Sequence, residues 1–207
     1  MDKYSGLWTT AETVGRSTRM EVVTMTVSLV PPMTGWTVDD LYRFPELGVR
    51  YELFDGSILV NPPPAMPHLR AVTRLHHLLF RQVPADLEIA ENVGVTIHGR
   101  RTFFIPDLCV LHAAALDKDT DQLDQDDVLF AVEVLSPSNP GNDLVLKRHY
   151  YAAGGIPQYW IVDPKDRKLT VLTLDGDSYV DRAVVRPGQV WRSDDPFPLT
   201  LDPAELL

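Results

Sequence analysis

The sequence predicts a mixed α/β protein of the α+β type, in which helices flank a mixed sheet that is extended by antiparallel hairpins. Two Asp-Gly pairs, at 55–56 and 175–176, lie between runs of β-forming residues, which is the pattern of a tight hairpin turn. Residues 128–135 form a nearly continuous apolar run, typical of a central strand covered on both faces. Strands and helices do not alternate strictly, so a regular βαβ fold is not expected.

The domain boundary is expected near residue 34. Residues 1–33 mix Thr, Ser, Gly and Met without a sustained period and end beside two prolines, so we expect a peripheral leader. The remaining residues, 34–207, are expected to form a single domain, because a chain of this length can bury a sizeable core.

The first half of this domain is expected to contain two helices, a hairpin and three further strands. Thr37 can cap the first helix, and Pro67 lies in the first turn of the second, where its missing N–H does no harm. The expected elements are a helix at 38–43, strands at 50–54 and 57–60, a helix at 67–82, strands at 87–91, 93–98 and 103–111 (interrupted at Pro106), and an acidic loop at 116–127.

The second half is expected to begin with the central strand and to end in a tail that packs along the outside. Asp143 can cap a helix, and Gly154-Gly155 can end it. The expected elements are a strand at 128–135, a helix at 143–153, a strand at 158–163, hairpin strands at 168–174 and 178–185, and the tail from Asp195.

Composition limits the class of protein and its partners. The formal net charge is −10, which argues against a general polyanion binder. No apolar stretch is long enough for a membrane helix and the start lacks a signal-peptide pattern, so we expect a cytoplasmic protein. The single cysteine, Cys109, cannot form an internal disulfide and is expected to be a small buried hydrophobe.

Three ionisable residues lie where a packed sheet would not favour them. Asp107 follows a proline inside a predicted strand, Glu133 lies inside the apolar run, and Lys147 lies one turn into the next helix. A buried charge is costly unless it is paired or holds a metal. The spacing can bring the three together as a site for a hard divalent cation and an activated water. A purely structural Asp–Lys–Glu network is the alternative, because such networks also perturb carboxylates.

Several short motifs occur in order along roughly residues 34–185. They are YELFDG at 51–56, His68 at a helix start, Pro106-Asp107, VEVLSPS at 132–138, Asp143 to Lys147, Tyr151, and GIPQYWIVDP at 155–164. As a set, they resemble the Uma family, whose members are assigned as bacterial endonucleases of the restriction-endonuclease-like, PD-(D/E)xK superfamily. The resemblance implies a restriction-endonuclease-like core with flanking helices, and metal-dependent hydrolysis of phosphodiester bonds, with DNA as the expected substrate.

The resemblance also implies roles for individual residues. Asp107 matches the aspartate of the PD motif and Glu133 the second acidic ligand. Together with the main-chain carbonyl of Val134, they are expected to hold Mg²⁺, or Mn²⁺ in its place. Glu52 matches an upstream glutamate of the family and is included among the candidate catalytic residues.

The lysine of the superfamily pattern is displaced in this sequence. The residue two after Glu133 is Leu135, so the strand lacks the usual lysine. Lys147, on the following helix, matches the position that this family uses instead. We expect it to orient the attacking water and to offset charge that develops on the phosphate.

The helix expected at 67–82 carries the other candidate residues. His68 shares a face with apolar residues, so a core histidine is the default, although its place at the helix start leaves a site role open. The opposite face carries a stripe of four residues at steps of four, three and four. Such a stripe is usually only solvated, but it is the best candidate for contacts with nucleic-acid phosphates. It comprises Arg70, Arg74, His77 and Arg81, with Arg100 and Arg101 as a candidate extension.

Two other functions remain open from the sequence. A catalytically silent module with a nuclease fold would keep the carboxylates for metal or stability, and a small-molecule hydrolase could use the same metal and water. A homodimer would suit double-strand cleavage.

Residues 117–127 contain six Asp and one Lys, so half of the net charge is confined to one loop. The net charge of −10 therefore permits a nuclease, but it predicts that the protein binds nucleic acid weakly and that this binding is sensitive to salt.

Overall fold

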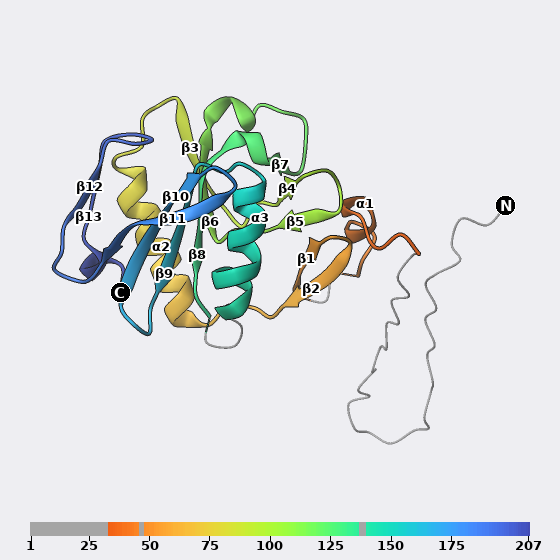
Figure 1. Ribbon diagram of the computed structural model, residues 1–207, viewed down its shortest axis with the longest axis horizontal. Helices are drawn as coiled ribbons and strands as arrows, with labels where there is room; N and C mark the ends of the chain where they lie inside the picture. The colour runs from red at the N-terminus through yellow and green to blue at the C-terminus, as the bar shows by residue number, and fades with distance from the viewer. Residues whose placement is uncertain (1–32, 46–47, 137–139) are drawn as a thin grey trace, which may run out of the picture. The chain divides into compact units, whose positions relative to one another are not determined.

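A mixed six-stranded sheet lies at the centre of the structure, a computed structural model that describes residues 33–45, 48–136 and 140–207 (Figure 1). Neighbouring strands are antiparallel except β8 and β9, which are parallel. This arrangement confirms the predicted mixed sheet. In spatial order the strands are β11 (Ser178–Val185), β10 (Lys168–Asp175), β9 (Gln158–Asp163), β8 (Val128–Val134), β6 (Leu108–His112) and β3 (Leu87–Glu91).

Two helices cover opposite faces of this sheet (Figure 1). Helix α2 (Met66–Phe80) packs in one apolar cluster with Val132, whereas α3 (Arg148–Ala153) packs in another with Ala131. Successive residues of a strand point to opposite faces, so β8 contributes to both clusters in turn. This double coverage explains why its sequence is apolar almost throughout.

A smaller five-stranded sheet continues the core. Its strands, in spatial order, are β2 (Ser57–Asn61), β1 (Arg50–Phe54), β5 (Thr102–Phe104), β4 (Val95–Ile97) and β7 (Leu123–Asp124), with only β4 and β7 parallel. Phe104 and Ile97 belong to the same apolar cluster as α3, so the two sheets share a core. The short helix α1 (Val38–Leu41) packs Val38 against Leu53 and Phe103.

Both predicted hairpins are present. Asp55 and Gly56 have φ angles of 48° and 78°, the pair of positive values that a type I′ turn requires. In the second hairpin Asp175 still pairs with Ser178, so the loop residues are Gly176 and Asp177, one position later than predicted. Glycine with a positive φ at the first loop position is typical of a type II′ turn.

The strand predicted at 103–111 is in fact two strands in different sheets. β5 ends at Phe104 and β6 begins at Leu108, on either side of the predicted break at Pro106. Cys109 on β6 is buried, as expected, and burial raises the pKa of its thiol to about 12. The acidic loop is more regular than predicted, because it contains β7 and η2 (Gln125–Asp127) and follows the 3₁₀ turn η1 (Ala113–Ala115).

The helix expected from Asp143 begins differently. Residues Asn142–Lys147 form a π-helical turn, η3, which continues into α3, and the N-cap residue is Gly141. The predicted capping role of Asp143 is therefore wrong. Its carboxylate Oδ1 instead lies 3.9 Å from the Lys147 ammonium, four residues later in the chain, which is the spacing of an ion pair along one helix face.

The C-terminal tail is part of the core, contrary to the prediction that it packs along the outside. β12 (Trp191–Ser193) and β13 (Leu199–Leu201) form a two-stranded sheet, followed by the 3₁₀ turn η4 (Pro203–Glu205). Alternate apolar residues of this segment are buried in the cluster beneath α2. They are Phe197, Leu199, Leu201 and Leu206. No helix in the described part of the chain is long and apolar enough to cross a membrane.

Candidate active site

A pocket of about 490 Å³ opens where the start of α2, the start of β6 and the end of β8 meet the β1–β2 hairpin. Three consecutive prolines, Pro62 to Pro64, form part of its wall. Four of the charged residues that line it are at most 4% exposed, so their charges must be balanced within the protein. The polar lining consists of Arg50, Glu52, Asn61, His68, Asp107, Glu133, Ser136, Asn142, Asp143 and Lys147.

Glu133 is held at the end of the central strand. Its neighbours Val132 and Val134 face α2, so the alternation of β8 points Glu133 toward α3. Its Oε1 accepts hydrogen bonds from the Lys147 ammonium at 2.8 Å and from the Tyr151 hydroxyl at 3.0 Å. Burial raises the pKa of Glu133 well above its usual value, and the attraction of Lys147 only partly offsets this.

Asp107 lies beside Glu133 because β6 and β8 are antiparallel, with Leu108 opposite Val132. The His68 imidazole Nε2 lies 2.9 Å from Asp107 Oδ1, and the Val134 amide donates to Oδ2 at 2.8 Å. Burial alone would raise the pKa of this carboxyl. The hydrogen bond and charge of His68, the Val134 amide and the charge of Lys147 outweigh burial and hold the pKa below its usual value.

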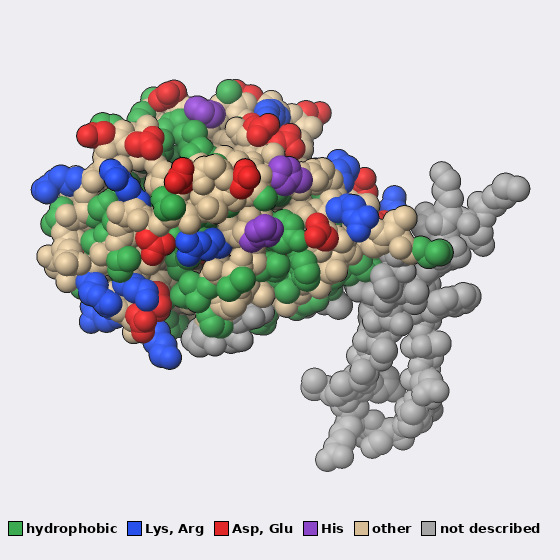
Figure 2. Space-filling model, viewed as in Figure 1, with side chains coloured by type: hydrophobic (Ala, Val, Ile, Leu, Met, Phe, Trp, Pro, Cys, Tyr) green, Lys and Arg blue, Asp and Glu red, His purple; other side chains and the backbone are tan. Residues whose placement is uncertain are grey.

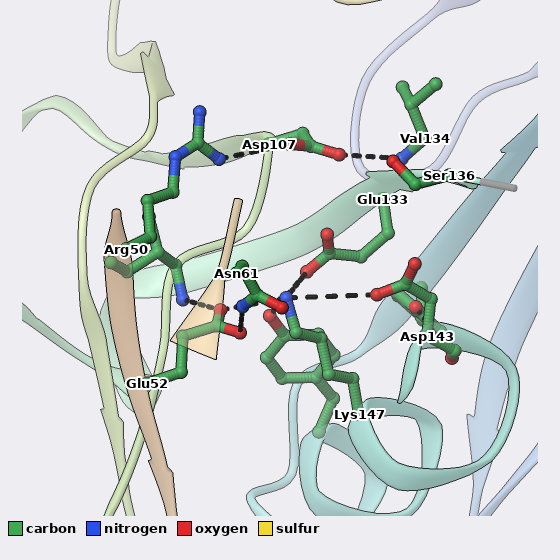
Figure 3. A network of polar contacts seen from close by, with 12 residues as sticks. Arg50, Glu52, Asn61, Asp107, Glu133, Val134, Ser136, Asp143 and Lys147 are labelled. Carbon is green, nitrogen blue, oxygen red and sulfur yellow. Dashed lines mark hydrogen bonds and ion pairs between the residues drawn. The ribbon is translucent and has the colours of Figure 1, made fainter. Parts of the chain in front are cut away.

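Lys147 is the central cation of the pocket (Figure 3). Its Nζ lies 2.8 Å from Glu133 Oε1, 2.9 Å from Glu52 Oε1 and 3.9 Å from Asp143 Oδ1. Burial would lower the pKa of this amine, but Glu133, Glu52 and Asp143 raise it above its usual value. Lys147 therefore stays charged at neutral pH. The predicted convergence of Asp107, Glu133 and Lys147 is present in the structure.

Glu52 comes from the other sheet, on β1. Its Oε2 accepts a hydrogen bond from the Asn61 amide Nδ2 at 2.6 Å, and its Oε1 accepts one from the Ile105 main-chain N–H, also at 2.6 Å. With the Lys147 contact, both of its oxygens are engaged. The ion pair between Glu52 and Lys147 thus joins the five-stranded sheet to the turn that follows β8.

His68 is both a buried helix residue and a site residue. It lies in the first turn of α2, on the same face as Val72 and Leu75, which are also buried. Its ring nitrogen Nδ1 is 3.4 Å from the Ser136 hydroxyl, and Nε2 contacts Asp107. The two roles weighed from the sequence are therefore compatible.

Several pocket residues were missed by the sequence analysis. Arg50 lies two positions before Glu52 on β1, so both point to the same face, and its Nη1 is 3.5 Å from Asp107 Oδ1. Asn61 pairs with Arg50 across the hairpin. The period of the strand could have suggested Arg50 as a partner of Glu52, whereas nothing in the local sequence indicates the contacts of Asn61 or Ser136.

The basic stripe lies outside this pocket. Its four residues are exposed, as expected for the outer face of α2, and none of them lines the pocket. Arg81 approaches Glu205 at 4.0 Å, and His77 contacts the Thr73 carbonyl at 2.9 Å. Arg100 contacts Asp39 on α1, and Arg101 donates to the Asp55 carbonyl in the turn between β1 and β2. The role of the stripe in binding nucleic acid therefore stays a prediction.

The pocket has the charge and the donor atoms that a divalent cation requires. Its four carboxylates outnumber its two basic side chains, Lys147 and Arg50. Carboxylate oxygens are the ligands that Mg²⁺ and Mn²⁺ prefer. As the side chains lie, no three His, Cys, Asp or Glu residues of the described chain form a ready metal-binding group. The donor chemistry fits an ion, but Lys147 occupies the space between two of the carboxylates.

Comparison with known proteins agrees with this fold and pocket. Residues 38–204 match the family Uma2, described as "Putative restriction endonuclease". The chain belongs to this family. A crystal structure from Anabaena variabilis ATCC 29413, described as a "putative nuclease", is similar to this Uma2 chain with a TM-score of 0.66 and 16% sequence identity, over 82% of this chain and 96% of that chain. No curated protein matches the chain.

These matches establish the family and the fold of the protein. Membership of Uma2 supports nuclease function. The structural similarity confirms the restriction-endonuclease-like fold that the motifs imply. Within that fold, the pocket is lined by residues of β1, β2, α2, β8 and η3 and by the segments that precede α2 and β6.

Proposed function

We propose that this chain is a divalent-metal-dependent nuclease that hydrolyses phosphodiester bonds, with DNA as its substrate. The observation that carries the proposal is the convergence of Asp107, Glu133 and Lys147 in one pocket of a Uma2 chain. Two buried carboxylates beside a buried ammonium supply both ligands for an ion and a group that can orient a water.

Asp107 and Glu133 would hold the ion through carboxylate oxygens, with the main-chain carbonyl of Val134 as a third oxygen donor. Mg²⁺ is the proposed ion, and Mn²⁺ can take the same oxygen ligands. When bound, the ion polarises the scissile phosphate and lowers the pKa of a bound water.

The protein's own groups orient the reactants. Lys147 keeps its charge and, next to Glu133, can hold the attacking water and offset charge that develops on the phosphate oxygens. His68 fixes the orientation of Asp107 through its hydrogen bond. The Arg50 side chain is 28% exposed beside Asp107, so its guanidinium is available to contact a substrate phosphate.

Cleavage assays on single- and double-stranded DNA and RNA, with Mg²⁺ or Mn²⁺ and with EDTA, test this function. We expect cleavage of DNA only with added metal, and a loss of at least about a hundredfold in Glu133→Ala and Asp107→Ala, because each removes a metal ligand. Glu88→Gln changes an exposed glutamate on β3 and should cleave like the wild type. Cleavage that survives in both alanine variants would refute the assignment.

The alternative of a catalytically silent binding module has one observation in its favour. Lys147 already bridges Glu52 and Glu133, and such a bridge can serve stability alone. Thermal unfolding with and without millimolar Mg²⁺ or Mn²⁺ separates the two functions. Binding to the folded state raises the melting midpoint, so a rise that disappears in Glu133→Ala favours the nuclease, whereas no rise favours the silent module.

We include a homodimer in the proposal for cleavage of duplex DNA, because two pockets are needed to cut both strands in one encounter. Analytical ultracentrifugation with and without a short duplex tests this. A species with twice the mass of the chain is expected under conditions in which both strands are cut.

A further inference from the structure

Glu52 is more firmly fixed than the other carboxylates around Lys147. It is 1% exposed, and each of its oxygens accepts a hydrogen bond of 2.6 Å, from Asn61 on one side and from the Ile105 main chain on the other. The antiparallel pairing of β1 with β2 places Asn61 beside this carboxylate. Movement of Glu52 toward a cation at Glu133 would strain or break one of these bonds, and a broken bond would leave a polar group unsatisfied in the interior.

Lys147 is shared between Glu52 and Glu133 at nearly equal distances, 2.9 and 2.8 Å (Figure 3). A cation that binds Glu133 must therefore displace the ammonium from Oε1 of that residue. The side chain of Lys147 is only 5% exposed, so its charge must be balanced within the protein when Glu133 is taken by the ion. It needs another carboxylate that remains in place.

We propose that Glu52, oriented by Asn61, is a positioning residue that keeps hold of Lys147 when a divalent cation takes Glu133, and that Glu52 is not itself a metal ligand. This inference rests on the proposed function, since it requires a cation at Glu133. Asp143, 3.9 Å from Nζ and at the edge of the same pocket, is the second carboxylate toward which the ammonium can move.

A double-mutant cycle on metal affinity tests this role. The dissociation constant of Mn²⁺ is measured by electron paramagnetic resonance of the free ion, for the wild type, Glu52→Gln, Lys147→Met and the double variant. Glu88→Gln is the matched control for removal of one glutamate charge, because Glu88 is exposed on β3, outside the pocket. The readout requires no catalysis.

We expect Glu52→Gln to weaken Mn²⁺ binding about tenfold, because Lys147 then depends on Glu133 and competes with the ion. In the Lys147→Met background the same change should alter the affinity less than about threefold, since the competitor is absent. Lys147→Met alone should bind Mn²⁺ more tightly than the wild type.

If Glu52→Gln weakened Mn²⁺ binding equally in the two backgrounds, the inference would be overturned. Glu52 would then act as a metal ligand or attract the ion through its negative charge alone. An unchanged affinity of Glu52→Gln in the presence of Lys147 would overturn it as well. A wild type that does not bind Mn²⁺ would instead remove the proposed metal site, so the two failures are distinguishable.

Asn61→Ala provides a second arm that leaves every charge in place, for use if circular dichroism shows that Lys147→Met does not fold. Loss of the Asn61 hydrogen bond loosens Glu52, so we expect about threefold weaker Mn²⁺ binding and a lower kcat, with an unchanged KM for DNA. A wild-type Mn²⁺ affinity and kcat in Asn61→Ala would contradict the positioning role.

Discussion

Asp143 shows how a single carboxylate responds to the excess negative charge of the pocket. Burial raises its pKa to about 6, against the attraction of Lys147 and with the help of the charges on Asp107 and Glu52. The folded protein therefore holds a proton at this position more tightly than the unfolded chain, whose pKa is near 3.8. The free energy of unfolding should fall as pH rises through this window, from about 4 to about 6.

Asp143→Asn should therefore stabilise the metal-free protein at neutral pH, because the amide cannot ionise. In EDTA at pH 7.5 we expect the melting midpoint to rise by a few degrees, at about 2–4 °C per kcal/mol for a chain of this size. The difference from the wild type should shrink toward zero near pH 4, where Asp143 is protonated when folded. A lower midpoint for the variant at pH 7.5 would mean that the attraction to Lys147 outweighs the cost of ionisation.

The residues of the pocket differ in how far the sequence reveals them. Glu133 stands out because an apolar strand has no local use for a charge, and Asp107 because it follows a proline that breaks a strand. For Arg50, the period of the strand indicates the same face as Glu52, but the contact with Asp107, 57 positions away, depends on a pairing of segments that this period does not specify.

At the level of elements, local signals predict most strands and the long helix, but not which strands become neighbours. β3 and β9 have the predicted bounds, and α2 lies within one or two residues of its predicted range. The run at 103–111 reads as one interrupted strand, yet its halves join different sheets. Tertiary packing also decides where the tail lies: Phe197, Leu199 and Leu201 alternate as in a half-buried strand, but this period does not specify that they pack beneath α2.

Burial of the tail leads to a prediction that local sequence would not make. Leu199 on β13 is buried in the cluster beneath α2, whereas the next side chain, Thr200, is exposed. Leu199→Ala should lower the free energy of unfolding by about 2–5 kcal/mol, and Thr200→Ala by no more than about 0.5 kcal/mol. Urea denaturation of the two variants measures the difference. Equal, small effects would mean that the tail packs along the outside, as predicted from the sequence.

At the level of the whole molecule, the face drawn in Figure 2 carries positive and negative side chains side by side rather than in one large patch of either sign. In the view of Figure 2, Lys and Arg side chains gather in small groups among acidic and apolar residues. With a net charge of −10, such a surface offers few phosphate contacts. The structure thus sharpens the expectation from composition: affinity for DNA should depend on a small number of arginines.

Replacement of the three stripe arginines, Arg70, Arg74 and Arg81, by alanine tests that expectation. If each contacts one phosphate, the slope of log affinity against log salt should become shallower by about 3 in the triple variant. Fluorescence anisotropy with a labelled duplex from 50 to 200 mM salt, in the Glu133→Ala background, gives the slope. As a matched control, replacement of the exposed Arg182, Arg186 and Arg192 by alanine should leave the slope of log affinity against log salt unchanged. An equal effect of both sets would exclude a special role for the stripe.

The ion pair between Glu52 on β1 and Lys147 on η3 has a consequence for the order in which the chain is made. Lys147 follows Glu52 by 95 residues, so β1 and β2 leave the ribosome long before the cation that neutralises Glu52. At translation rates of roughly 5–20 residues per second, the delay is about 5–20 s. During that interval the first hairpin carries an uncompensated acidic group on the face that it must later bury. We therefore expect the β1–β2 hairpin to dock against the pocket after η3 has emerged, which makes the completed pocket a late product of synthesis.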